Sequence, residues 1–532
     1  MRFLPLILLL SACATAAPPQ ASPEQRAERW WADISALAND AMEGRQTGTP
    51  GYQRAADYVV SRLEGLGLKP AGVDGSFFQP VAFEEQFVDA AGSSAALVDA
   101  NGRETPLAIP SDLIVSRGDG PRPAQVEAPL VFIGYGLHIP EAGHDDFAGL
   151  DLKGKIAVVV SGGPADISGA LKAHARRDRT RLLSERGAVG LLSLTTPKAV
   201  EVPWSRTMVM STGSGMYFAD PALREVKGPF YSAGVNPETS GKLFARSGRS
   251  FADIAALADA SKPLPRFEMK QSLRAVTATR LRPTVSPNVV ARIPGGDPKL
   301  KAEHVVLSAH LDGLGIGDPI AGDRIYNGAL DNAAGVASLL DIAAAIRARG
   351  VKPRRSILFV FVTAEEKGLL GSRYFSLRPT VPKASMVANF NFDMALPIFP
   401  LKSVIALGAE ESSLGGEAAM VGAETGLPLV PDPFPDRNAF VRSDQYSFIR
   451  EGVPALAFKF GFAKDAPEAA IEKAWRSTRY HAPSDDLSQP AERLDAVRLD
   501  DFVTALTWRT ANAPVKPAWL ATSFFRRFAK GN

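Results

Sequence analysis

Five short motifs in the second half of this chain carry histidine and carboxylate side chains, the groups that bind divalent cations in proteins. They are Ser308–Asp312, Gly328–Asn332, Thr363–Glu366, Phe392–Met394 and Tyr480–Pro483. Three of the five follow apolar runs typical of buried strands, where an unpaired carboxylate is costly. A pair of divalent cations would satisfy all these side chains at once. The motifs therefore point to a two-metal hydrolytic site.

The charges of the candidate ligands balance those of two divalent cations. The cations bring +4 and Asp331, Glu366 and Asp393 bring −3, so a bridging hydroxide would close the balance. His310 and His481 would each add one neutral imidazole ligand to a metal. Mixed histidine and carboxylate ligation suits Zn²⁺, and Co²⁺ or Mn²⁺ is also compatible. A bridging carboxylate would hold the metals roughly 3.5–4 Å apart.

Each motif taken alone also has an ordinary structural interpretation. Asp331 could only cap the helix that follows it, and Glu365 with Glu366 could form a solvated turn. The two histidines could be hydrogen-bonded core residues, and backbone donors could hold Asp393. The joint occurrence of the motifs, in this order and at strand ends, favours the metal site.

From Ser286 onward, apolar runs alternate with helical patterns, which is typical of a sheet covered by helices. A helix is predicted from Asn332 to Arg349, with Asp331 and Gly350 as its start and stop signals. The predicted strands are 288–292, 305–309, 356–363, 387–392, 404–407 and 454–458. Open α/β sheets bind ligands at the carboxyl ends of their strands, so motifs far apart in sequence can converge there.

The bulk composition is that of an ordinary globular protein. The chain has 532 residues, enough for two or three domains. Apolar residues make up 45% and charged residues 22%, and the formal net charge is +3. A nearly neutral chain without runs of basic residues gives no support to nucleic-acid binding.

The N-terminus has the layout of an export signal. Arg2 precedes the apolar run Phe3–Leu10, which is too short to span a bilayer as a helix. The segment Leu10–Cys13 resembles the bacterial lipobox, whose cysteine is lipidated and becomes the mature N-terminus. An ordinary signal peptide cut near Ala14–Ala16 is the alternative. Because Cys13 is the only cysteine, no intramolecular disulfide is expected, and no later segment reads as a transmembrane helix.

The five motifs resemble those of the M28 metallopeptidases, co-catalytic zinc aminopeptidases and carboxypeptidases. His-x-Asp, Ala-x-Asp-Asn, Glu-Glu-x-Gly, Asp-Met and a late His-x-Pro stand in family order. The resemblance covers about 27–68 and 286–512. It implies an α/β fold with a mixed central sheet and helices on both faces, the zinc-exopeptidase fold.

The resemblance also implies a role for each candidate ligand. Asp331 would bridge the metals. His310 and Asp393 would bind one metal, while Glu366 and His481 would bind the other.

Further roles follow from the same resemblance. Glu365 would be the general base, Asp312 would orient the site from just outside it, and Asp485 could steady His481. At Leu330 many family members have a second acid, which is not the bridging ligand.

A β-rich insert interrupts the peptidase pattern. The runs 129–133, 156–160 and 190–194, with a helical stretch at 179–186, resemble a protease-associated (PA) domain; another small α/β insert is the alternative. The expected organisation is a signal, lipobox and tether (1–22), an N-terminal peptidase part (23–77), a PA-like insert (78–283), the catalytic domain (284–515) and a tail (516–532).

Substrate contacts are harder to assign. The segment Phe440–Gln445 resembles an Arg-Ser-Asp-His segment near the substrate in the family, with glutamine in place of histidine. Arg442 could contact substrate and Tyr446 could help hold an oxyanion, or both could serve only surface and packing roles. The aromatic and basic tail Trp519–Lys530 could touch a membrane or pack on the catalytic domain.

The sequence thus predicts an exported, lipid-anchored, two-zinc exopeptidase in the cell envelope, facing the periplasm or exterior. Peptides are the expected substrates. Removal of N-terminal residues is favoured by family frequency and by the absence of an obvious basic pocket for a C-terminal carboxylate. A carboxypeptidase or dipeptidase on the same site is one alternative, and a metal-free, receptor-like binding protein is the other.

Overall fold

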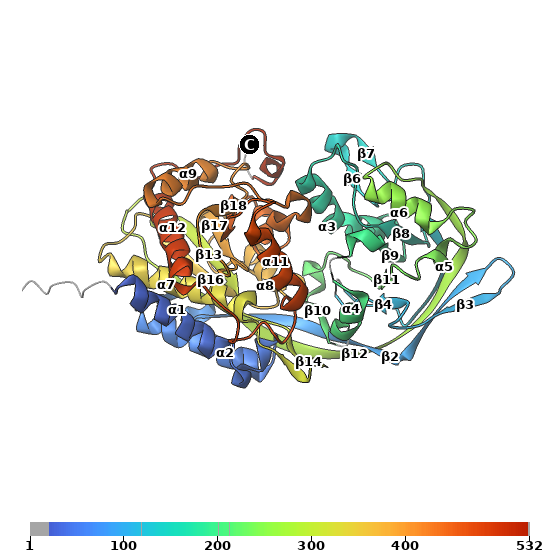
Figure 1. The fold of residues 1–532 in the computed structure, drawn as a ribbon, viewed down its shortest axis with the longest axis horizontal. Helices are drawn as coiled ribbons and strands as arrows, with labels where there is room; N and C mark the ends of the chain where they lie inside the picture. Colours follow the sequence, from blue (N-terminus) through green and yellow to red (C-terminus); the bar gives the residue numbers. More distant parts are fainter. Residues whose placement is uncertain (1–20, 119, 201, 212, 530–532) are drawn as a thin grey trace, which may run out of the picture.

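The computed structural model describes residues 21–529 except 119, 201 and 212. Cys13 and the lipobox lie outside the described residues. Figure 1 shows two lobes side by side, joined by two long strands that run along one edge of the molecule. These strands are β2 (Phe78–Asp99) and β12 (Phe267–Ile293), which pair antiparallel over most of their length.

The first lobe is built on a mixed sheet. Its parallel strands are β13 (His304–His310), β16 (Ser356–Val362), β17 (Met386–Phe392) and β19 (Ala455–Phe460). β18 (Val404–Leu407) pairs antiparallel with β19 at one edge, and β12 pairs antiparallel with β16 on the other side. Every residue of β13, β16 and β17 is buried, which explains why these strands read as unbroken apolar runs.

Helices cover both faces of this sheet. One face packs against α1 (Pro23–Leu37), α2 (Pro50–Gly65), α7 (Ala334–Ala348), α9 (Leu414–Thr425), α11 (Pro467–Thr478) and α12 (Arg493–Asn512). The other packs against α8 (Leu370–Leu377) and α10 (Gln445–Ile449), through Phe375 and Phe448. The predicted mixed sheet with helices on both faces is confirmed.

The second lobe continues the same sheet. β5 (Gln125–Phe132), β8 (Ile156–Val160), β9 (Gly190–Leu194) and β11 (Tyr231–Val235) are parallel, β4 (Leu113–Val115) closes the edge, and β5 pairs with β12. α3 (Gly169–Glu185), α5 (Gly241–Phe244) and α6 (Phe251–Asp259) pack on it. The identification of this lobe as a PA domain stays a prediction.

The helix predicted from Asn332 begins later than expected. α7 starts at Ala334, after one π-helical turn (Ala329–Ala333) in which Asp331 has a non-helical backbone. Asp331 is therefore not the cap of this helix, and its carboxylate is free for other contacts. Among the described residues, 329–348 is also the one helix whose length and composition would allow a membrane span, but it lies mostly buried in the first lobe.

The described part of the C-terminal tail packs on the protein. Phe525, in the short 3₁₀ helix Phe524–Phe528, is fully buried in a cluster with Trp519 and Tyr446. The indole nitrogen of Trp519 donates to the Gly452 carbonyl at 3.0 Å. Of the two alternatives for the tail, packing is the one that the structure supports.

Candidate metal centre

The structure brings the five candidate ligands together at the carboxyl edge of the central sheet. His310 is the last residue of β13, and Asp393 directly follows β17. Glu366 stands four residues after the end of β16. Because neighbouring parallel strands end at the same edge, these side chains meet although they are far apart in sequence.

The five side chains form two groups that share one carboxylate. His310 Nε2 lies 3.2 Å from one oxygen of Asp331 and 3.6 Å from Asp393 Oδ1. His481 Nε2 lies 3.4 Å from the other Asp331 oxygen and 3.4 Å from Glu366 Oε2. Within each group the potential ligand atoms lie within 4.8 Å of one another. Asp331 thus offers one oxygen to each group, the arrangement that a bridging ligand needs.

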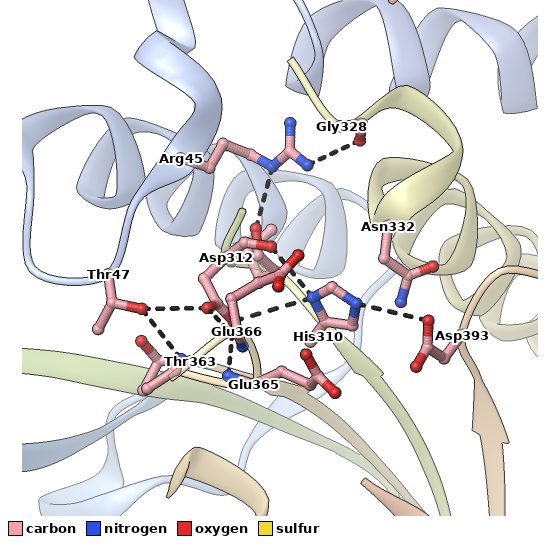
Figure 2. Close-up of polar contacts among 12 residues, drawn as sticks. Arg45, Thr47, His310, Asp312, Gly328, Asn332, Thr363, Glu365, Glu366 and Asp393 are labelled. Atoms are coloured by element: carbon pink, nitrogen blue, oxygen red, sulfur yellow. Dashed lines mark hydrogen bonds and ion pairs between the residues drawn. The ribbon is translucent and has the colours of Figure 1, made fainter. Parts of the chain in front are cut away.

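The histidine geometry fits metal binding. His310 Nδ1 lies 3.1 Å from the backbone carbonyl oxygen of Asp312, so that nitrogen carries the proton and donates it. Nε2 faces Asp331 and Asp393, so it can donate to these carboxylates when protonated and can bind a cation among them when deprotonated. Metal-binding histidines commonly use their second nitrogen in this way to fix the tautomer. Figure 2 shows His310 between the Asp312 loop and Asp393.

The clustered carboxylates are electrostatically unfavourable without cations. Burial raises the pKa of Glu366 to about 7 and raises that of Glu365 well above its usual range. Burial lowers the pKa of His310, but hydrogen bonding to Asp331 and Asp393 outweighs this effect. The pKa of His310 therefore lies well above its ordinary value. Protons therefore supply the positive charge that two divalent cations would supply in their place.

Asp312 holds the backbone of the segment that carries Glu365 and Glu366. It is fully buried, and its two oxygens accept from the amides of Glu365 at 3.0 Å and Glu366 at 3.3 Å. Thr47 completes the arrangement, because its hydroxyl donates to Asp312 at 3.1 Å and accepts from the Ala364 amide at 3.1 Å. Figure 2 shows these contacts. Asp312 thus positions the segment from behind.

Asp485 has a different partner from the expected one. Its two oxygens accept from the backbone amides of Leu330 and Asp331, each at 3.0 Å. It therefore fixes the backbone of the shared carboxylate and not the ring of His481. That ring stacks instead on Tyr480, with 3.9 Å between ring centroids. A carboxylate bonded to amides 154 and 155 residues away leaves no periodic pattern in the sequence.

Arg45, in the 3₁₀ segment Asp40–Arg45, is a positioning residue that the sequence did not reveal. Its guanidinium is fully buried and donates to four backbone carbonyls, at 2.6–3.0 Å. The acceptors are Leu311, Leu37, Asn327 and Gly328. Burial lowers the pKa of Arg45 to about 10, while nearby carboxylates oppose that shift. Arg45 therefore ties together the segments that lead to His310 and Asp331 (Figure 2).

Replacing Arg45 with methionine should destabilise the protein by about 3–5 kcal/mol, because four buried carbonyls lose their donor. Urea denaturation of the purified variant measures this loss. Arg54→Met is the matched control, since Arg54 is largely exposed and pairs with Glu43 at 2.9 Å, a contact worth about 0–1 kcal/mol. Equal losses in the two variants would contradict the role assigned to Arg45.

The turn that contains Asp331 depends on two residues, Gly328 and Asn332. Gly328 has φ of +61°, and a Cβ there would lie 2.3 Å from the Asp331 carbonyl oxygen, so only glycine fits. The Asn332 side chain donates to the Phe392 carbonyl at 2.8 Å. That bond links the turn directly to the end of β17, next to Asp393.

The residues suggested as substrate contacts each have a polar partner within the protein. The hydroxyl of Tyr446 is 2.6 Å from Nδ1 of His174, a residue of α3 in the second lobe. Tyr446 is almost fully buried, so its position favours a packing role over contact with an oxyanion. Arg442 is exposed, and its guanidinium donates to the Arg437 carbonyl at 3.4 Å. Contact of either residue with substrate stays a prediction.

Comparison with known proteins agrees with these motifs. Residues 288–502 match peptidase family M28. The chain is 29% identical over 241 residues to leupeptin-inactivating enzyme 1 of Streptomyces exfoliatus, covering 43% of this chain and 50% of that protein. It is 34% identical over 174 residues to probable leucine aminopeptidase 2 of Aspergillus fumigatus, covering 32% of each. The matched segments thus span half or less of these relatives.

A solved structure shares the fold. The aminopeptidase from Aneurinibacillus sp. strain AM-1 aligns over 92% of this chain and 95% of its own, with a TM-score of 0.54 and 19% identity. This likeness concerns the fold, and the match to peptidase family M28 concerns residues 288–502.

Proposed function

We propose that this protein is a metal-dependent exopeptidase that removes N-terminal residues from peptides, with two zinc ions held by the two ligand groups. The observation that carries the proposal is the shared carboxylate of Asp331, which presents one oxygen to each group. Two histidines and three carboxylates form a donor set that suits Zn²⁺. The similar proteins include aminopeptidases, which agrees with this activity.

When bound, the two cations would polarise the scissile carbonyl and lower the pKa of the attacking water. Glu365 belongs to neither ligand group, so its carboxylate remains available for proton transfer. Figure 2 shows its side chain reaching towards the space beside His310 and Asp393. Glu365 takes the proton from the attacking water and returns it to the leaving amine nitrogen, which is general base and then general acid catalysis.

A small apolar pocket begins one residue after Asp393 and favours an apolar N-terminal side chain. Its walls include Met394, Leu396, Phe399 and Phe460, with a polar side formed partly by Lys459. The Lys459 ammonium donates to the carbonyl of Asp393 at 3.2 Å, which ties this pocket to the ligand edge. A leucyl peptide is therefore the substrate of choice for tests.

Acetylating the N-terminus of Leu-Ala-Ala-Ala should lower kcat/KM by about 100-fold or more. The free α-amine is a cation beside a carboxylate cluster, and losing a charge-assisted contact costs about 1.5–3 kcal/mol before the steric clash of the acetyl group is counted. Mass spectrometry of the products should find leucine released first from the unblocked peptide.

The other outcomes separate the alternatives. Efficient cleavage of the acetylated peptide with release of C-terminal alanine would identify a carboxypeptidase on the same site. No hydrolysis of either peptide, in protein that binds no metal, would identify a receptor-like binding protein.

Export and lipid anchoring through Cys13 belong to the same proposal. Their support is the sequence Leu-Ser-Ala-Cys at the end of a short apolar run. Mass spectrometry of the mature N-terminus tests them: diacylglycerol on Cys13 is expected, and an unmodified N-terminus beyond Cys13 would rule the anchor out.

A further inference from the structure

A cavity rich in basic side chains lies between the two lobes. Its volume is about 260 Å³, and its walls come from α3, β9, β10 (Gly215–Phe218) and β11 on one side and from 367–373 on the other. Figure 1 places α3, β10 and α8 at the junction of the lobes. The basic residues in its walls are Arg176, Arg177, Arg179, Arg224, Lys367 and Arg373. Among its lining residues the one carboxylate is Glu225.

Glu225 is engaged by two arginines, Arg450 and Arg373, and leaves most of the other basic side chains of the cavity without an acid partner in its wall. It lies 2.5 Å from a guanidinium nitrogen of Arg450 and 3.6 Å from one of Arg373. Asp178, the nearest acid on α3, pairs with Arg181 at 2.7 Å. The cavity therefore keeps a net positive charge, although the whole chain is almost neutral at +3.

Four of the basic side chains are held by carbonyl oxygens. Arg177 donates to Gly368, Arg179 to Tyr135 and Lys367 to Ser214, each at 3.0 Å. Arg224 donates to the carbonyls of two neighbouring residues in the same way. None of the four forms an ion pair with a carboxylate of the described residues. Carbonyl dipoles fix these cations in place without cancelling their charge.

Two polar atoms in the cavity wall have no hydrogen-bond partner among the described residues. They are Nε of Arg179 and the hydroxyl of Ser232, which is 94% buried (6% exposed). Buried donors are almost always paired. Burial also lowers the pKa of Arg179 to about 10. Both atoms are themselves covered, so they add polarity to the cavity wall and are not points of contact for a ligand.

The cavity adjoins the segment that carries Glu365 and Glu366. Lys367 and Gly368, which line it, directly follow Glu365 and Glu366. Consecutive Cα atoms are about 3.8 Å apart, so Lys367 stands within about 7.6 Å of Glu365 along the backbone. Glu365 is the residue assigned to the leaving amine. A peptide residue spans roughly 3.3–3.6 Å, so the chain reaches the cavity two or three residues beyond the scissile bond.

We propose that this cavity binds the C-terminal carboxylate of a short peptide whose N-terminal residue is removed at the metal centre. The inference rests on the proposed function and adds a substrate class to it: peptides of three or four residues with a free carboxylate. Both lobes supply the site, so the second lobe takes part in substrate choice. The expectation that no basic pocket serves a C-terminal carboxylate is thereby revised.

The test compares Leu-Ala-Ala-Ala with its C-terminal amide in the metal-loaded enzyme. The free acid should have a kcat/KM about 10–100-fold higher, the range expected for charge-assisted bonds in a buried site. Arg177→Met and Arg179→Met should each move this ratio towards one. Because both substrates are measured on one preparation, any loss of folded enzyme cancels in the ratio.

Arg186→Met is the matched control, since Arg186 ends the same helix but lies over the Phe147 ring, outside the cavity. It should keep the wild-type ratio. Inorganic phosphate should raise KM for Leu-Ala-Ala-Ala and leave leucyl-p-nitroanilide, which has no carboxylate, unaffected.

A wild-type ratio near one would overturn the proposal. If phosphate then altered leucyl-p-nitroanilide hydrolysis, the cavity would be a site for a free anion. An unchanged ratio in both arginine variants would also overturn it. Failure to cleave any of the substrates would instead refute the exopeptidase function.

Discussion

Glu365→Gln should lower kcat by about 10²–10⁴-fold while the metals stay bound. The amide keeps the shape of the side chain but cannot take a proton from water. Glu365 lies outside both ligand groups, and its backbone amide is held by Asp312 whatever the side chain is. Metal content by mass spectrometry, measured with steady-state kinetics on the leucyl peptide, tests both halves of the expectation.

Glu366→Gln is the matched control because it makes the same chemical change one residue further on. Glu366 belongs to the group with Asp331 and His481, so this variant should lose metal as well as activity. If Glu365→Gln were as active as wild type, or lost metal like Glu366→Gln, the division of roles between the two adjacent acids would be wrong.

The sequence located the central sheet and the candidate ligands because both leave local signals. β13, β16 and β17 are continuous apolar runs with one motif after each, Asp331 stands before α7, and the motif of His481 follows α11. The motifs come together at the carboxyl edge of the sheet, where Asp331 lies between the two histidines. Local pattern and parallel topology were sufficient for this part.

The supporting contacts could not be predicted because they join side chains to backbone groups far away in the sequence. Arg45 reaches a carbonyl 283 residues away, and Asp485 accepts from an amide 154 residues away. Neither contact corresponds to a periodic pattern or to a fixed spacing of residues in the sequence. Tyr446 was considered for an oxyanion contact because it follows the segment Phe440–Gln445. Its hydroxyl instead lies next to His174 of the second lobe.

The insert was predicted as a separate module, but the structure ties it to the first lobe. β2 and β12 run through both lobes, so the two halves share one sheet. α3 then returns to the ligand edge, where Arg177 contacts Gly368, two residues after Glu366. The second lobe is thereby positioned to influence substrates at the metal centre.

Asp331→Asn should release more metal than His481→Ala, because Asp331 belongs to both ligand groups and His481 to one. Loss of a shared anionic ligand weakens both sites, so bound metal should fall well below one ion per chain, from up to two in the wild type. His481→Ala should keep the group of His310 and Asp393. Metal analysis after gel filtration measures the metal content of both variants.

Chelation of the metals in the wild type should abolish hydrolysis. Full activity after exhaustive metal removal would refute the two-metal mechanism.

Metal removal should also change how stability depends on pH. In the metal-free protein the pKa of Glu366 is raised by burial from 4.5 to about 7, so between these values the native state binds more protons than the unfolded state. Stability must then fall as pH rises through this window. Burial also raises the pKa of Asp485 to about 6, and this shift changes stability in the same direction. Bound cations replace those protons, so the metal-loaded protein should lose less stability between pH 5 and pH 7. Urea denaturation of both forms at the two pH values tests this, and equal losses would show that the cations do not sit among these carboxylates.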